Sequence, residues 1–259
     1  MKSKKETFGD LLQSFTHRYD LRPVFDDFLT LALCAVSHNP STGKSHYEDL
    51  YMETIAPYAK DELRHIFPKM LAMLILEMEE RVDSGSGNDV LGETYEQNFC
   101  RKNSGQFFTP WHVCEMMSAI TVGNADTEAD RPLHIIDPTC GSGRMLMAGA
   151  KRLGWRHEYY GIDIDHTCVK MTVLNLFLNG IFHAEVMCAD ALRPDDFRIS
   201  YVTSFLPFGI FRIEDKEKSK LWHMHRNSFE RKTDGPKREI SLPSEDGPGT
   251  GNGSQLKLF

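Results

Sequence analysis

The chain has 259 residues and a net charge of −7, with 41% hydrophobic and 26% charged residues. These values are typical of a globular, cytoplasmic protein, and they argue against one that coats nucleic acid non-specifically. The longest apolar run, Met70 to Leu76, is too short to span a bilayer. The six cysteines contain no Cys-x-x-Cys pair and the eleven histidines form no ligand cluster, so we expect reduced thiols and no metal site.

Residues 1–90 are predicted to form a helical region. Pro23 suits the first turn of a helix, where its missing N–H is not needed. Apolar residues then recur at helical spacing in two runs: Val24, Phe28, Leu31, Ala32 and Ala35, and later Phe67, Met70, Leu71, Leu74, Ile75 and Met78. The small polar stretch 83–88 predicts a flexible break, which places a domain boundary near residue 90.

Residues 91–230 are predicted to form an α/β domain. Thr109 and Pro110 have the residue types of an N-cap and a first helical position. Predicted strands and helices then alternate as Leu133–Asp137, a helix from Arg144, Glu158–Asp163, a helix over 166–179, Glu185–Cys188 and Ile199–Phe205. Such alternation favours a parallel sheet covered by helices.

A turn of small residues follows the first predicted strand: Asp137, Pro138, Thr139, Cys140, Gly141, Ser142 and Gly143. At such a strand–turn–helix junction, bare backbone approaches a ligand and helix N–H groups point at it. The acid at the end of the strand makes a phosphate less suitable than a ligand with a cationic or amino group.

Three acids follow three successive strands, namely Asp137, Asp163 and Asp190. The carboxyl ends of strands in an open α/β sheet line the ligand crevice. Asp163 lies at the usual distance beyond the glycines for accepting from ribose hydroxyls, and Asp190 is suited to accept from an adenine amino group. One such acid is commonly only a helix cap, but three acids with the glycine turn favour a nucleoside ligand.

Three segments resemble methyltransferase motifs in their usual order: Gly105–Pro110 (GQFFTP), Asp137–Gly143 (DPTCGSG) and Gly161–Asp165 (GIDID). The family is the amino-group DNA methyltransferases that form N6-methyladenine, especially the modification subunits of type I restriction systems. The resemblance covers roughly residues 90–209, and residues 1–95 resemble the helical N-terminal region of those proteins. It implies a Rossmann-like methyltransferase fold, with a sheet that is shorter here.

The resemblance also implies S-adenosylmethionine as the cofactor and DNA as a partner, with a specificity subunit or other partner for target recognition. Asp163 would hold the ribose, Ile164 would pack on the adenine and Asp190 would meet its amino group. The methionine part would be surrounded by Gln106, Phe107, Phe108, Thr109 and Pro110 and by the turn from Asp137 to Gly143.

The same family carries its chemistry in an Asn-Pro-Pro-Phe/Tyr tetrad after the fourth strand. The matching stretch keeps Pro207 and Phe208, but Phe205 stands at the Asn position and Leu206 at that of the first Pro. Phenylalanine has no acceptor for the amino hydrogens, and loss of an aimed polar group at a reacting centre costs about 10²–10³ in rate. Two hypotheses follow. One is an adenine-N6 DNA methyltransferase, and the other is a catalytically impaired module that binds cofactor or DNA at the replication clamp.

Beyond Gly209, residues 212–229 are predicted to form one mixed-charge helix, so that the sheet stops at about four strands with the Ile199–Phe205 edge open. Residues 231–259 are rich in Gly, Pro and charge and are predicted to be disordered. The tail ends in a peptide that resembles a bacterial sliding-clamp-binding motif, with Gln255, Leu256, Leu258 and Phe259 as its contacts. Chance and docking on the open sheet edge are the alternatives.

Overall fold

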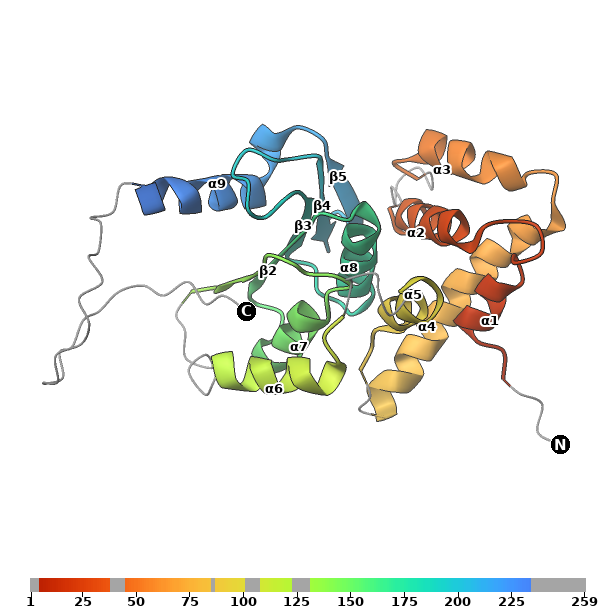
Figure 1. The fold of residues 1–259 in the computed structure, drawn as a ribbon, viewed down its shortest axis with the longest axis horizontal. Helices are drawn as coiled ribbons and strands as arrows, with labels where there is room; N and C mark the ends of the chain where they lie inside the picture. Colours follow the sequence, from red (N-terminus) through yellow and green to blue (C-terminus); the bar gives the residue numbers. More distant parts are fainter. Residues whose placement is uncertain (1–4, 38–44, 85–86, 101–107, 123–130, 234–259) are drawn as a thin grey trace, which may run out of the picture.

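The computed structural model describes residues 5–37, 45–84, 87–100, 108–122 and 131–233 (Figure 1). No helix in this part of the chain is long and apolar enough to cross a bilayer. The helices are α1 (Phe8–Gln13), α2 (Leu21–Val36), α3 (Glu48–Ile55), α4 (Ile66–Ser84), α5 (Val90–Phe99), α6 (Trp111–Val122), α7 (Arg144–Leu153), α8 (His166–Leu178) and α9 (Lys220–Thr233), with short 3₁₀ turns η1 (Ala56–Tyr58), η2 (Glu62–His65) and η3 (Lys216–Lys218). The strands are β1 (His134–Asp137), β2 (Glu158–Asp163), β3 (Ala184–Cys188), β4 (Ile199–Ser204) and β5 (Gly209–Ile213).

The N-terminal region is helical, as predicted, and lies on the right in Figure 1. It consists of α1 to α4 within residues 1–90 and of α5, which extends beyond the predicted boundary. Side chains cap three of their starts: Thr7 and Asp10 form a capping box at α1, and Asp20 and Asp89 accept from first-turn N–H groups of α2 and α5. A cap of this kind contributes about 1 kcal/mol to helix stability. Pro23 lies in the first turn of α2, where its ring is tolerated.

The sheet has five strands in the order β1-β2-β3-β4-β5. Strands β1, β2 and β3 are parallel, whereas β4 runs antiparallel to β3 and β5 antiparallel to β4. The α/β class is therefore confirmed, but the sheet is mixed and not parallel throughout. The connections explain the change of direction: α7 and α8 carry the chain between parallel strands, whereas residues 189–198 contain no helix. A parallel crossover needs a dozen or more residues, so β4 reverses beside β3.

The prediction that the sheet stops at four strands is wrong. Residues 209–213 form β5, and α9 begins only at Lys220, so the predicted single helix over 212–229 was placed too early. The sequence Ile210-Phe211-Arg212-Ile213 has the β-branched and aromatic residues that suit a strand. The edge of β4 is therefore covered by a hairpin partner.

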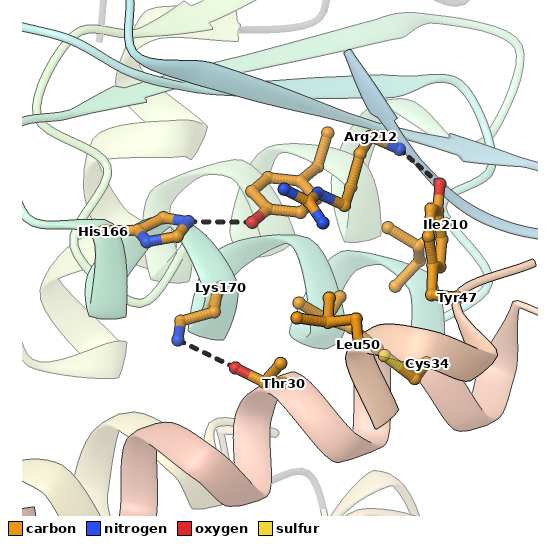
Figure 2. A pocket seen from close by; sticks show the side chains of 10 residues that line it. Thr30, Cys34, Tyr47, Leu50, His166, Lys170, Ile210 and Arg212 are labelled. Atoms are coloured by element: carbon orange, nitrogen blue, oxygen red, sulfur yellow. Dashed lines mark hydrogen bonds between the residues drawn. The ribbon is translucent and has the colours of Figure 1, made fainter. Parts of the chain in front are cut away.

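The helical region covers the outer edge of β5 in turn. The Ser37 hydroxyl lies 2.6 Å from the carbonyl oxygen of Ile210 and 3.4 Å from its nitrogen. The Tyr47 hydroxyl accepts from the backbone N–H of Arg212 at 2.7 Å (Figure 2). These contacts satisfy edge groups that would otherwise be open to pairing with another chain.

A small cavity of about 130 Å³ lies beside these contacts, between α2, α3, α8, β4 and β5 (Figure 2). The buried Lys170 amine is held at its rim by Asp26 at 2.7 Å and Thr30 at 3.1 Å. His166 lies 2.8 Å from the Tyr201 hydroxyl. The polar contacts around this cavity thus join the helical region to α8 and the sheet.

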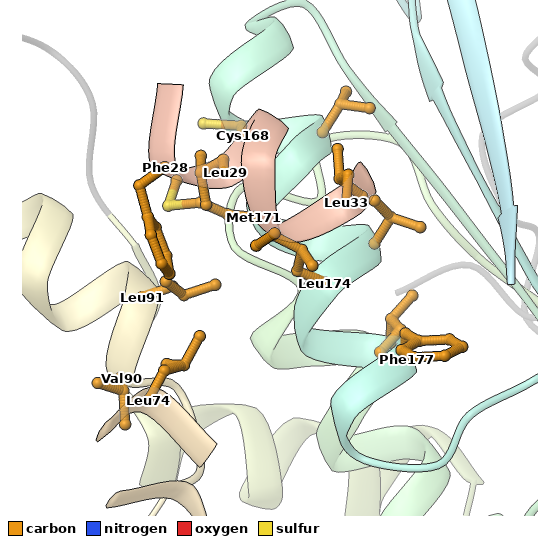
Figure 3. Close-up of a cluster of buried hydrophobic side chains, with 14 of the residues drawn as sticks. Phe28, Leu29, Leu33, Leu74, Val90, Leu91, Cys168, Met171, Leu174 and Phe177 are labelled. Atoms are coloured by element: carbon orange, nitrogen blue, oxygen red, sulfur yellow. The ribbon is translucent and has the colours of Figure 1, made fainter. Parts of the chain in front are cut away.

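Helix α8 is buried between the sheet and the helical region. Its apolar side chains extend around the whole helix, as expected of one that is covered on all sides. Figure 3 shows Met171 and Leu174 of α8 among Leu29 and Leu33 of α2 and Leu91 of α5. The N-terminal helices and the sheet therefore share one hydrophobic core, and a division into domains at residues 1–90 and 91–230 stays a prediction.

Helix α9 packs on the opposite face of the sheet. Leu221 and Trp222 are fully buried there and belong to a second, smaller apolar cluster with Tyr160, Ile162 and Met187. Burial of two large side chains at its first turn fixes the helix on β2 and β3. The rest of α9 extends toward the carboxyl ends of the parallel strands, where it lines a cavity.

Candidate functional site

A cavity of about 1220 Å³ lies at the carboxyl ends of β1, β2 and β3. One part of its lining is the turn after β1 and the ends of β2 and β3, and another part is α9, which contacts the residues after β3 through His225 and the Arg193 carbonyl oxygen. Asp137, Asp163 and Asp190 all line this cavity, so the structure brings together the three acids that the sequence pointed out. Ligands of open α/β sheets bind at this end of the strands.

The turn after β1 depends on two glycines in the left-handed region. Gly141 has φ 57° and Gly143, which precedes α7, has φ 87°. A Cβ at Gly141 would lie 2.9 Å from the ring of Phe108, and one at Gly143 would lie 3.0 Å from the Thr172 methyl group. Only glycine fits both the backbone conformation and the space.

Asp137 is 6% exposed, and its Oδ1 accepts from the Thr139 N–H at 3.0 Å. Burial and, to a smaller extent, the neighbouring Asp163 charge raise its pKa to about 6, and the Thr139 N–H opposes this change. Among the described residues, no basic side chain forms an ion pair with this carboxyl group. Asp137 is thus a buried acid in a cavity wall that a cationic ligand would stabilise in its charged form.

Asp163 links the end of β2 to the glycine turn. Its two oxygens accept from the N–H groups of Gly141 and Asp165, each at 2.9 Å. Burial raises its pKa, and these N–H groups oppose the change. Each carboxylate oxygen has two lone pairs, so Asp163 keeps acceptor capacity toward the cavity.

Asp190 lies at the end of β3, next to the solvent. It accepts from the Leu192 N–H at 3.0 Å and forms an ion pair with Arg193 at 3.3 Å. The neighbouring Ile164 is 57% exposed and Leu192 is 84% exposed, and both line the cavity. An apolar ring that packed between them would cover this surface.

A buried ion-pair network holds the turn from behind. Arg144, the first residue of α7, contacts Asp89 at 2.5 Å and Glu96 at 2.7 Å. Asp89 also accepts from the Ser142 hydroxyl at 2.6 Å and from Asn175 at 2.8 Å. Burial alone would lower the pKa of Arg144, but the two carboxylates raise it above its usual value. The guanidinium is therefore held in this ion-pair network, where it positions the glycine turn.

The sequence analysis missed this network, although it contains a signal. A basic residue at the first position of a helix opposes the helix dipole, so it needs an acidic partner. Asp89, directly before an apolar helical run, was available for that role. Phe108 completes the arrangement, because its ring packs over Gly141 and lies 5.5 Å from the Arg144 guanidinium.

The remaining predicted cofactor residues are placed as follows. Phe108, Thr109, Pro138, Thr139, Cys140, Gly141 and Ser142 line the cavity; Gly143 supports it from behind, and Pro110 lies beside it before α6. Helix α6 begins at Trp111, one residue after the predicted first position. Gln106 and Phe107 lie outside the described residues.

The tetrad-like segment does not lie in the cavity. Because β4 is antiparallel to β3, Ile199 pairs with Cys188 at the cavity end and Thr203 pairs with Ala184 at the other end. Four residues along a strand separate these ends by about 13 Å. Phe205 and Phe208 lie at the far end, where they pack on Phe182 with ring centroids 5.4 and 5.7 Å away, and Pro207 lies between them.

The catalytic role of Pro207 and Phe208 therefore has no geometric support from this cavity and stays a prediction. The clamp-binding residues Gln255, Leu256, Leu258 and Phe259 lie outside the described part of the chain. Their role stays a prediction as well.

The fold and this cavity define a nucleoside-binding α/β protein, and the comparisons with known proteins identify its family. Residues 86–234 match the N-6 DNA Methylase family, and the chain belongs to that family. It is 27% identical over 195 residues to the methylase subunit of the type I restriction enzyme MpnII from Mycoplasma pneumoniae, covering 70% of this chain and 35% of that protein. The chain thus spans about a third of the length of this curated relative.

Among solved structures, the chain resembles the methyltransferase subunit of a type I restriction-modification system from Streptococcus thermophilus. The TM-score is 0.38 at 19% identity, with 73% of this chain and 57% of that chain covered.

The cofactor of this family is S-adenosylmethionine, and the cavity fits it. Asp137 supplies an acid that forms no ion pair within the described part of the chain and that suits a positively charged sulfonium or ammonium group. The bare Gly141 backbone allows close approach, and Ile164 offers an apolar surface. The volume exceeds the roughly 300–1,000 Å³ of common small-molecule pockets, so the whole molecule can enter.

Proposed function

We propose that this protein transfers a methyl group from S-adenosylmethionine to the exocyclic amino group of adenine in DNA, as a modification subunit of a type I restriction system. The observation that supports this most directly is the glycine turn with the two acids Asp137 and Asp163, inside the segment that matches the N-6 DNA Methylase family. DNA as substrate corresponds to a cytoplasmic location in a bacterial cell.

In this proposal the cofactor is held by the turn after β1 and by the ends of β2 and β3. Asp137 lies near its positive charge, the turn from Pro138 to Ser142 approaches the methionine part, and Phe108 closes that side. Asp163 accepts from ribose hydroxyls. Ile164 and Asp190 are assigned to the adenine ring and its amino group.

The proposed partners are DNA and at least one further subunit that recognises the target sequence. The curated relative is named as a methylase subunit, and the present chain spans about a third of it. A net charge of −7 also favours a division of labour, in which another component supplies most of the phosphate contacts.

Calorimetry with S-adenosylmethionine tests the cofactor site. We expect binding by the wild type and loss of binding in Asp163→Ala, which removes the ribose acceptor and frees the Gly141 N–H. Glu79→Ala, an exposed change on α4, is the control and should bind like the wild type. No binding by the wild type would refute the proposed function.

Transfer of a tritiated methyl group to adenine-containing DNA tests the reaction itself. Label in N6-methyladenine supports the proposal, and label in cytosine would correct the substrate. Binding without transfer, in the presence of a specificity subunit, would identify the protein as a cofactor-binding module.

A further inference from the structure

The edge of the cavity that is assigned to the cofactor's adenine lies just beyond the paired part of the sheet. Strands β2 and β3 pair up to Asp163 and Cys188, and the Ala189 N–H then donates to the Asp163 carbonyl oxygen at 3.0 Å. Ile164 and Asp190, which are assigned to the adenine ring and its amino group, follow directly after these residues. The ladder of the sheet therefore ends before the two residues whose relative position matters for adenine.

Two side chains that do not line the cavity join Ile164 to Asp190. Asp196 accepts from the Asp190 N–H at 2.7 Å. Arg198 donates to the Ile164 carbonyl oxygen at 2.8 Å and contacts the Asp196 carboxylate at 3.4 Å. Together these contacts form a bridge of two hydrogen bonds and one ion pair between the backbones at the ends of β2 and β3.

The antiparallel return of the chain places this bridge behind the cavity. Arg198 directly precedes β4, and its own N–H donates to the Cys188 carbonyl oxygen at 3.0 Å. The connection over residues 189–198 thus leaves β3 and comes back to the same end of that strand. Arginine suits this position because its planar guanidinium carries several N–H donors in a fixed geometry, so it can reach a carbonyl oxygen and a carboxylate at once.

We propose that Asp196 and Arg198 are positioning residues that make the cofactor site select the amino group of adenine. This assignment rests on the proposed function and deepens it. A ring that packs on Ile164 brings its amino group to Asp190 only if these two residues are held in a fixed relative position, because a hydrogen bond needs a donor–acceptor distance of about 2.7–3.2 Å. The bridge supplies this constraint from outside the cavity.

Other contacts at this edge are weaker links. The Cys188 thiol, a weak donor, lies 3.7 Å from the Ile164 carbonyl oxygen. Arg193 contacts the Asp190 carboxylate at 3.3 Å, but its side chain is 78% exposed, and ion pairs at the surface contribute little. Neither contact links the end of β2 to the backbone of Asp190, as the bridge does.

Calorimetry on the full chain with two ligands tests the assignment: S-adenosylhomocysteine, and its analogue in which hydrogen replaces the amino group of the purine. The wild type should prefer the amino compound by about 10-fold, as expected for one hydrogen bond to a charged group. Arg198→Met keeps an unbranched side chain but has no donor. Its affinity for S-adenosylhomocysteine should fall by about 10-fold, while its affinity for the analogue should stay that of the wild type. Asp196→Asn, which has nearly the same shape as the wild type and forms no ion pair, should shift the preference in the same direction.

Arg18→Met is the matched control. Arg18 also forms an ion pair, with Asp61 at 2.8 Å, but it belongs to the N-terminal region and does not line the cavity, so this variant should bind both ligands like the wild type. Asp190→Ala removes the proposed acceptor itself and should lose the preference. Adding Arg198→Met to Asp190→Ala should then cause no further change, because both substitutions act on one interaction.

An equal loss of affinity for both ligands in Arg198→Met would show a merely structural role and overturn the proposal. A preference that Arg198→Met and Asp196→Asn both retain would overturn it as well. If the wild type binds the two ligands equally well, the selectivity is absent and the inference is wrong, although the proposed function stands. Failure of the wild type to bind either ligand would instead count against the proposed function.

Discussion

Asp137→Asn should stabilise the protein and weaken cofactor binding at the same time. The side chain is 6% exposed, and its pKa is raised from 3.8 to about 6 by burial. An acid whose pKa is higher in the folded state destabilises that state when it ionises, so the penalty grows from about pH 4 to about pH 6 and is fully present above this range. A difference of about two in pKa corresponds to about 3 kcal/mol. Asparagine keeps the Oδ1 acceptor for Thr139 but carries no charge.

The free energy of unfolding of Asp137→Asn should therefore exceed that of the wild type by up to about 3 kcal/mol near pH 7.5 and match it near pH 4. Binding should change in the opposite direction, because a charged hydrogen-bond partner is worth about 1.5–3 kcal/mol. That loss corresponds to an affinity for S-adenosylmethionine lower by about 10- to 150-fold.

Urea denaturation at both pH values and calorimetry at the higher one measure these effects. Asp215→Asn is the matched control, since Asp215 is exposed, lies outside the cavity and accepts from a backbone N–H two residues on, as Asp137 does. Lower stability of Asp137→Asn near pH 7.5, or an unchanged affinity for S-adenosylmethionine, would refute the interpretation that Asp137 is a buried acid whose charged form is stabilised by a cationic ligand.

Three further predictions concern the turn, the sheet edge and the tetrad-like segment. Gly141→Ala should weaken cofactor binding and lower stability by about 1–3 kcal/mol, because it combines φ 57° with a close ring contact. Gly180→Ala, at φ 75° with its nearest atom 4.0 Å away, measures the effect of positive φ without that contact, and an equal loss in both variants would contradict the steric argument. Tyr47→Phe should lower the free energy of unfolding by about 1–3 kcal/mol and speed hydrogen exchange of the Arg212 amide in β5. Unchanged exchange would show that other groups protect this edge. Phe205→Asn should leave methyl transfer unchanged, because the residue lies at the far end of the sheet; a gain in rate would mean that this segment reaches the cofactor.

The parts of the site that the sequence predicted are those built from neighbouring residues. A strand, a glycine turn and a helix start follow one another over Asp137 to Gly143, so local patterns suffice to place them. Asp163 and Asp190 could be predicted because strands joined by helical crossovers end at the same edge of a sheet.

The placement of β4 could not be obtained from the order of strands alone. The sequence pattern shows which segments are strands, but it does not show which strands are neighbours in the sheet. In addition, the family resemblance suggested that the tetrad lies near the cofactor. The missing helix in residues 189–198 was the physical signal, since a connection that short favours an antiparallel neighbour.

The covering of β5 by the N-terminal helices has a consequence for biosynthesis. Ser37 and its partner Ile210 are separated by 173 residues. At about 5–20 residues per second, a ribosome needs about 10–35 s to make the strand after it has made the helix that covers it. For most of this interval α2 has neither α8 nor β5 to pack against, so the nascent helices expose apolar surface that chaperones can bind. Destabilising substitutions in α2 should therefore reduce the yield of folded chain in cells more than their effect on equilibrium stability suggests.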